Sequence, residues 1–107
     1  MDPASSVLHY GQEIFEGLKA YRRPDGSIVT FRPEENARRL NASARRLALP
    51  ELPEDLFVQA VRELVTIDAD WVPSGDDQTL CLRPFMIADE SFLGVRAAHR
   101  ARFMVIA

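Results

Sequence analysis

The tripeptide Pro24-Asp25-Gly26 restricts the fold of this chain more than any other feature of its sequence. Proline presets the backbone angle at the first corner of a turn, and glycine supplies a positive φ at a later one. Short runs with β-branched and aromatic residues, 18–22 and 27–31, flank the tripeptide. This pattern predicts a β-hairpin.

Two helices are expected after the hairpin. Pro33 opens the first, with acidic residues beside it at the positive end of the helix dipole, and Pro50 ends it. The second begins at Pro53 in the same way. The apolar stripe predicted for the first helix is Ala37, Leu40, Ala44, Leu47 and Ala48. The stripe predicted for the second is Leu56, Phe57, Ala60, Val61, Leu64 and Val65.

The rest of the chain reads as a loop over residues 70–77, a long strand over 79–88 and a final strand over 102–107. A hairpin, two helices and then strands predict an α+β fold, with an antiparallel sheet and the helices on one side. The last apolar run stops without a turn or cap, so we expect more chain to follow it.

Composition excludes several functional classes. The 107 residues suit one domain, and a net charge of −3 argues against a nucleic-acid groove, which needs a basic surplus. A single cysteine, Cys81, rules out an internal disulfide framework and fits a reducing compartment. No apolar run approaches the roughly 20 residues of a membrane span, and the N-terminus lacks the pattern of a signal peptide. We therefore expect a cytoplasmic protein without a membrane partner.

Arginines are the main candidates for binding chemistry. Arg83 lies within an apolar run, where a charge is costly unless it faces water or meets an anion. Pro84 beside it permits an edge strand or a bulge, and a bulge can re-aim a side chain near a site. On the first helix, Arg39 and Arg46 fall on the side away from the apolar stripe. That side is either a solvated face or a place where one arginine grips a phosphate or carboxylate.

Other chemistries find little support. His9, His99 and Cys81 lack metal-ligand spacing, so no metal site is expected. Lys19 is the only lysine and lies in a hairpin strand, which makes it a weak candidate for Schiff-base chemistry. The segment 10–22 is irregular, with glycines and aromatics interleaved, and is shaped either by a site or by packing alone.

Several motifs together resemble the branched-chain amino-acid aminotransferases, pyridoxal-phosphate enzymes of the D-alanine-aminotransferase-like fold. They are YGQEIFEGLKAYR at 10–22, FRP at 31–33, Asn36 with Arg39-Leu40, DWVP at 70–73, LRP at 82–84 and LGV at 93–95. The resemblance implies that residues 1–107 form the smaller N-terminal domain. It places the family's Schiff-base lysine in a C-terminal cofactor domain that this chain lacks, so no residue here matches the catalytic one.

The resemblance also implies roles for individual residues. Arg39 matches the arginine that holds the phosphate of pyridoxal 5'-phosphate. Phe15 and Arg83 match residues of the substrate pocket, where Arg83 would receive the distal carboxylate of glutamate. Tyr10, Leu93 and Val95 match residues lent to the partner's site across a homodimer. The implied reaction moves an amino group between leucine, isoleucine or valine and 2-oxoglutarate, and this chain alone is expected to be inactive.

One departure and two alternatives bear on that expectation. Cys81 stands where the family commonly has tyrosine, which removes a hydroxyl and a ring from the pocket. A D-amino-acid aminotransferase or an aminodeoxychorismate lyase-like enzyme would share the fold. A non-catalytic, stand-alone dimerisation domain is the other alternative.

Overall fold

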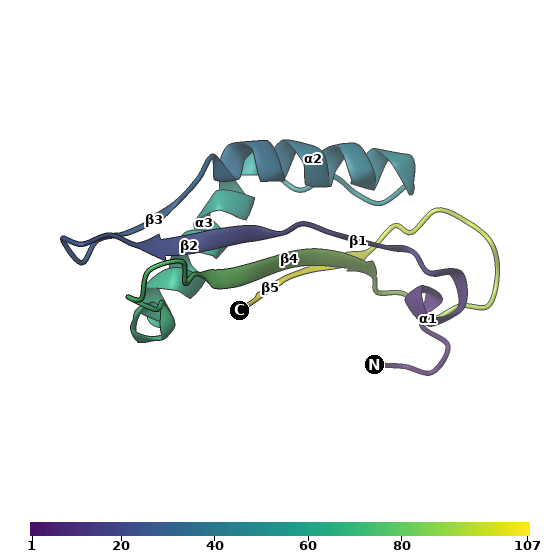
Figure 1. The fold of residues 1–107 in the computed structure, drawn as a ribbon. Helices are drawn as coiled ribbons and strands as arrows, with labels where there is room; N and C mark the ends of the chain where they lie inside the picture. The colour runs from purple at the N-terminus through teal and green to yellow at the C-terminus, as the bar shows by residue number, and fades with distance from the viewer.

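Five strands form one antiparallel sheet, and helices pack against one of its faces. The computed structural model describes residues 1–107. Its helices are α1 (Ser6–Tyr10), α2 (Pro33–Arg46) and α3 (Glu54–Ile67), and η1 (Ala69–Trp71) is a single 3₁₀ turn. Its strands are β1 (Glu13–Phe15), β2 (Leu18–Arg22), β3 (Ile28–Thr30), β4 (Leu80–Ala88) and β5 (Ala101–Ile106). Figure 1 shows α2 lying along the sheet, and the predicted α+β class is confirmed.

The predicted hairpin is formed by β2 and β3. Tyr21 pairs with Val29, and Arg23 N donates to Ser27 O at 2.8 Å to close the turn. Gly26 has φ 85°, the left-handed conformation for which the sequence reserves a glycine. The side chain of Asp25 accepts hydrogen bonds from the backbone and hydroxyl of Ser27, so the turn is held by its own residues.

Strand β4 pairs along both of its edges, with β1 and β2 on one side and β5 on the other. The expectation that Pro84 marks an edge or a bulge is therefore wrong. Phe15 pairs with Phe85 and Leu18 with Leu82, so β1 and β2 keep one register and no residue is inserted. Glu16 N donates to Pro84 O at 2.8 Å, and the proline ring nitrogen cannot return the bond. The missing N–H interrupts the ladder between β1 and β2.

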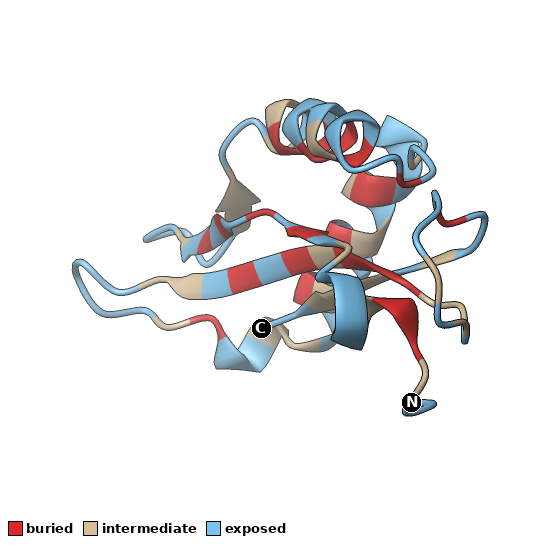
Figure 2. Ribbon diagram, turned by 90° about the vertical axis from the view of Figure 1, so that its right-hand side faces the viewer, coloured by how far each residue is buried: buried red, intermediate tan, exposed pale blue.

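The core lies between this sheet and the two long helices. Alternate strand residues, among them Leu18, Ala20 and Leu82, face α2 and α3 and are buried. Red bands along the strands and on the inner side of α2 mark this face in Figure 2. Asn41 ties the α2–α3 connection to α2, because its side chain both donates to Leu52 O and accepts from Leu52 N.

Parts of the predicted helical stripes are not buried. Leu47, Ala48 and Leu56 are exposed, and Ala60 and Leu64 are half-buried. The remaining residues of the two stripes are buried as expected: Ala37, Leu40, Ala44, Phe57, Val61 and Val65. Helix α2 ends at Arg46, and Ala48 adopts a positive φ of 52°, so the helical spacing no longer applies to Leu47 and Ala48. Leu56 lies in the first turn of α3, beside the completely buried Phe57. None of the helices is both long and apolar enough to cross a membrane.

Phe57 should be the main anchor of α3. Its ring is fully buried and packs against the ring of Phe103 on β5, with the two ring centroids 5.8 Å apart. We expect Phe57→Ala to lower the free energy of unfolding by about 3–5 kcal/mol, because it leaves a cavity in the core. The neighbouring Leu56→Ala is the matched control, since Leu56 is 46% exposed and should cost far less. Chemical denaturation followed by circular dichroism measures both, and equal losses would contradict the assignment.

Candidate functional site

Two cavities meet at residues 17–19 and contain the predicted cationic site residues. One, here called the Arg39 cavity, has a volume of about 370 Å³ and lies between β2, Phe31 and the start of α2. The other, the Arg83 cavity, has about 600 Å³ and includes Cys81, Arg83 and Ile106. Gly17, Leu18 and Lys19 line both. Arg39 and Arg83 are therefore on adjoining sides of one short segment of chain.

A buried carboxylate orients Arg39. Glu16 is only 8% exposed, and its Oε2 accepts from Arg39 Nη2 at 2.7 Å while Oε1 accepts from Arg39 Nε at 3.2 Å. Asn36 Nδ2 donates to the same carboxylate at 2.8 Å and to Gly17 O at 3.2 Å. The hydrogen bonds and charge of Glu16 raise the pKa of Arg39 above its usual value. Two of the three guanidinium nitrogens are thus fixed, and Arg39 points in one defined direction.

The Arg39 cavity has the donors that a phosphate requires. Lys19, Arg32 and Arg39 line it, against one carboxylate, that of Glu35. Glu35 already pairs with Arg32 and with Arg38, so part of its charge is compensated. The third guanidinium nitrogen of Arg39, Nη1, makes no hydrogen bond within the chain. Guanidinium forks bind phosphate oxygens, so Arg39, with Arg32 beside it, fits the phosphate of the implied cofactor.

Phe15 and Arg83, the predicted substrate-pocket residues, are in contact. Both lie on the face of the sheet that no helix covers, and the guanidinium carbon of Arg83 stands 4.6 Å from the centroid of the Phe15 ring. At an exposed site such a cation–π contact stabilises by about 0.5–1 kcal/mol. Arg83 has no carboxylate within salt-bridge distance, which leaves its hydrogen-bond donors available for an anion.

Tyr10, Leu93 and Val95 gather at the other end of the sheet. The Tyr10 ring stacks on Phe92, with centroids 6.5 Å apart, and a bridge between Ser5 and Ser91 joins the two segments. In Figure 1, α1 and the loop before β5 lie side by side at this end. Leu93 is 72% exposed and Val95 is 92% exposed, and neither lines the Arg39 cavity or the Arg83 cavity. The structure thus places these three residues on two neighbouring segments, away from the Arg39 and Arg83 cavities.

Glu90 holds the loop that carries Leu93 and Val95. Its carboxylate accepts from Arg96 Nη2 at 3.0 Å, from His99 N at 2.7 Å and from Arg100 N at 3.2 Å. The hydrogen bond from Arg96, helped by the two backbone donors, lowers the pKa of Glu90 from 4.5 to about 2. At neutral pH the loop is therefore closed around a charged carboxylate.

Glu16 and Asn36 belong to the site, although the sequence analysis assigned them no role. Both lie within the motifs that carry the family resemblance. Glu16 lies two residues from both Ile14 and Leu18, which face the core. Because side chains two apart on a strand lie on the same face, the carboxylate of Glu16 is placed on the buried face. A buried carboxylate needs cationic or hydrogen-bonding partners. That signal was available in the sequence and points to the arginine-rich helix as the partner.

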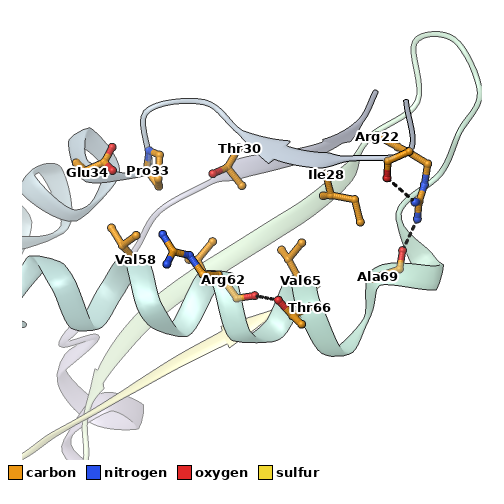
Figure 3. A pocket seen from close by; sticks show the side chains of 12 residues that line it. Arg22, Ile28, Thr30, Pro33, Glu34, Val58, Arg62, Val65, Thr66 and Ala69 are labelled. Carbon is orange, nitrogen blue, oxygen red and sulfur yellow. Dashed lines mark hydrogen bonds between the residues drawn. The ribbon is translucent and has the colours of Figure 1, made fainter. Parts of the chain in front are cut away.

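A third cavity, of about 610 Å³, lies between α3 and the hairpin and contains none of the predicted site residues. Figure 3 shows Val58 and Val65 on one side of it and Ile28 on the other. Arg22 closes one end, donating to Ala69 O at 2.6 Å, to Val72 O at 3.1 Å and to Gly26 O at 3.3 Å. Because backbone carbonyls use all of these donors, Arg22 ties the hairpin to η1. No group of three or more potential metal ligands occurs in the structure.

Comparison with solved structures defines the class of the fold. The branched-chain amino acid aminotransferase of T.th., complexed with N-(5'-phosphopyridoxyl)-L-glutamate, matches 98% of this chain with a TM-score of 0.78 and 29% identity. The match covers 34% of that structure's chain. The Escherichia coli branched-chain amino acid aminotransferase matches with a TM-score of 0.76 at 24% identity, over 98% of this chain and 32% of its own. The fold is that of the D-amino-acid-aminotransferase-like enzymes.

Sequence comparison finds relatives among the branched-chain-amino-acid aminotransferases. The chain is 60% identical over 108 residues to the branched-chain-amino-acid aminotransferase of Mycolicibacterium smegmatis, covering 100% of this chain and 29% of the relative. It is 49% identical over 106 residues to branched-chain-amino-acid transaminase 1 of Bacillus subtilis, covering 99% of this chain and 30% of the relative. No protein-family profile matches. The chain is related throughout its length to the branched-chain-amino-acid aminotransferases and corresponds to their N-terminal part, about 30% of their length.

Replacing Glu16 should destabilise the protein and release Arg39. In Glu16→Gln an amide N–H₂ faces the guanidinium, so a buried hydrogen-bond network loses its charge and part of its bonding. We expect the free energy of unfolding to fall by about 1–3 kcal/mol. Glu13→Gln, on the same run of strand but exposed, is the control and should change it by less than about 0.5 kcal/mol. Denaturant titration measures both, and an unchanged stability in Glu16→Gln would contradict the network.

Acid should open the loop around Glu90. Because the pKa of Glu90 is lowered by folding, its contribution to stability is complete above pH 4.5 and is lost as pH falls towards about 2. We expect the amide proton shifts of His99 and Arg100, which donate to this carboxylate, to move across that interval in an NMR titration. Glu90→Gln should abolish the transition, whereas Glu63→Gln on the surface of α3 should leave it intact. A transition that persists in Glu90→Gln would refute the assignment.

Proposed function

We propose that this chain is part of a pyridoxal-phosphate-dependent branched-chain-amino-acid aminotransferase and contributes residues that bind the substrate and the phosphate of the cofactor. The observation that carries the proposal is the meeting of the Arg39 and Arg83 cavities at Gly17–Lys19. A transaminase must hold the phosphate of its cofactor beside a substrate that carries a carboxylate, and the two cavities offer separate cationic positions for these groups.

Each residue then has a physical task. Arg39, fixed by Glu16 and Asn36, binds phosphate oxygens through its remaining donors. Phe15 provides an apolar wall for a branched aliphatic side chain, and Arg83 above it receives the distal carboxylate of 2-oxoglutarate or glutamate. One pocket thereby accepts both an apolar and an acidic substrate. Bound pyridoxal phosphate supplies the electron sink that lets the substrate's α-carbon lose and regain a proton.

We also propose that the complete protein is a homodimer. Tyr10, Leu93 and Val95 form an exposed, mostly apolar group joined by the Ser5–Ser91 bridge and the stack on Phe92. Exposed apolar side chains gathered in this way favour a protein partner. Their roles in the related enzymes, as the sequence resemblance implies them, make that partner a second copy, whose substrate pocket they would border.

The test is an assay on the complete protein that contains this chain. We expect it to convert leucine and 2-oxoglutarate into glutamate and the matching 2-oxo acid. Arg39→Gln should weaken the apparent affinity for pyridoxal phosphate by about 10- to 100-fold, because charge-assisted hydrogen bonds to the phosphate are lost. Arg46→Gln is the matched control, since Arg46 lies on the exposed side of the same helix and outside the Arg39 cavity.

Two results would contradict the proposal. The first is a complete, cofactor-loaded protein that transaminates no branched-chain substrate. The second is activity on D-alanine that exceeds activity on leucine, which would favour the D-amino-acid enzymes of the same fold. Equal cofactor affinity in Arg39→Gln and Arg46→Gln would remove Arg39 from the phosphate site.

A further inference from the structure

Four residues on the uncovered face of the sheet form a block that we call the cation recess: Gly17, Lys19, Cys81 and Arg83. Lys19 pairs with Cys81, and the continuous register places Gly17 opposite Arg83. Glu16 N donates to Pro84 O, so Glu16 and Pro84 form a hydrogen-bonded pair. Because pair types alternate along an antiparallel ladder, Gly17–Arg83 and Lys19–Cys81 are both non-hydrogen-bonded pairs. Side chains on facing strands approach most closely in such pairs. Two cations thus lie on one diagonal of the block and two small residues on the other.

The fold does not require a glycine at position 17. Its φ lies outside the left-handed region, and a Cβ added there would meet no atom within 4 Å. A larger residue would therefore be compatible with both the backbone and the packing. The missing side chain instead leaves open the space between Phe15 and Lys19, directly across from Arg83. Open space bordered by two cations is suited to an anionic ligand.

The two cations of the recess lack carboxylate partners. Neither Lys19 nor Arg83 forms an ion pair, although seven ion pairs occur elsewhere in the chain. Glu35, which shares the Arg39 cavity with Lys19, is occupied by Arg32 and Arg38. Neighbouring like charges on a sheet face are unfavourable. A bound anion would remove that repulsion.

We infer that Lys19 is a second carboxylate-binding residue, which acts with Arg83 in the Arg83 cavity and favours dicarboxylate ligands. The inference rests on the proposed function and adds a specificity-determining residue to it. Both side chains line the same cavity of about 600 Å³, together with the apolar side chain of Ile106. A short aliphatic chain would lie along the apolar surface while its terminal carboxylate meets both cations. Ligands without that carboxylate would gain nothing from Lys19.

The test compares two unreactive ligands on the complete protein by isothermal titration calorimetry. Glutarate carries the second carboxylate, and 4-methylpentanoate carries a branched tail instead. We expect Lys19→Met to weaken glutarate binding by about tenfold, the loss of one charge-assisted hydrogen bond, and to change 4-methylpentanoate binding little. Lys19→Arg keeps the charge and should retain most of the glutarate affinity.

Arg62→Gln is the matched control, because it removes one positive charge from α3, which packs on the other face of the sheet. It should leave both affinities unchanged. Equal weakening of both ligands by Lys19→Met, or no weakening of glutarate, overturns the inference. The leucine assay on the same preparations keeps the two proposals apart. An active protein whose Lys19→Met variant binds glutarate normally refutes only the role of Lys19, and an inactive wild-type protein refutes the proposed function itself.

Discussion

The pairing of β4 along both edges is the constraint on which the rest of the structure depends. It joins β1 and β2, from the first part of the chain, to β5 at the end, and it brings Arg83 beside Phe15 and Lys19 across a large separation in sequence. Pro84 survives in this central strand because its missing N–H faces the junction between β1 and β2. There the chain loses one ladder hydrogen bond and keeps its register, so residues 13–20 run beside β4 in one continuous register.

Local rules explain which parts of the fold were predictable. The hairpin follows from turn chemistry at Pro24 to Gly26, and both helices follow from proline at their starts and a period near 3.6 residues. Predictions were wrong where the helical spacing of apolar residues was applied beyond the buried part of a helix. Leu47 and Ala48 follow the end of α2. Leu56 lies on α3 about 140° round the helix from Val61, the middle of the buried face, so it points away from the core although Phe57 beside it is buried. Pro84 misled for another reason, since sequence cannot show which way its ring nitrogen faces.

The candidate site also has parts that could be predicted from the sequence and parts that could not. Charge within an apolar run singled out Arg83, and the family resemblance supplied Phe15 and Arg39. The adjoining of two cavities at Gly17–Lys19 could not be predicted, because it depends on how α2 lies over the edge of β2. The partner of Glu16 could not be predicted either, although the alternation of the strand already placed its carboxylate on the buried face. Sequence gives the direction of a strand side chain, and tertiary packing decides what it meets.

Side chains of residues 14–20 point alternately to the two faces of the sheet, and this separates the residues that stabilise the fold from those proposed to bind ligands. Ile14, Leu18 and Ala20 build the core, while Phe15, Gly17 and Lys19 between them lie on the uncovered face. Gly17 and Lys19 border both cavities, and Phe15 contacts Arg83. Site residues can therefore vary with little effect on packing. Glu16 is the exception, because it lies on the buried face yet bonds to Arg39 at the cavity. Its burial is costly unless its partners stay in place. The folding of the core thereby fixes the direction of Arg39, and the proposed phosphate site is organised before any ligand arrives.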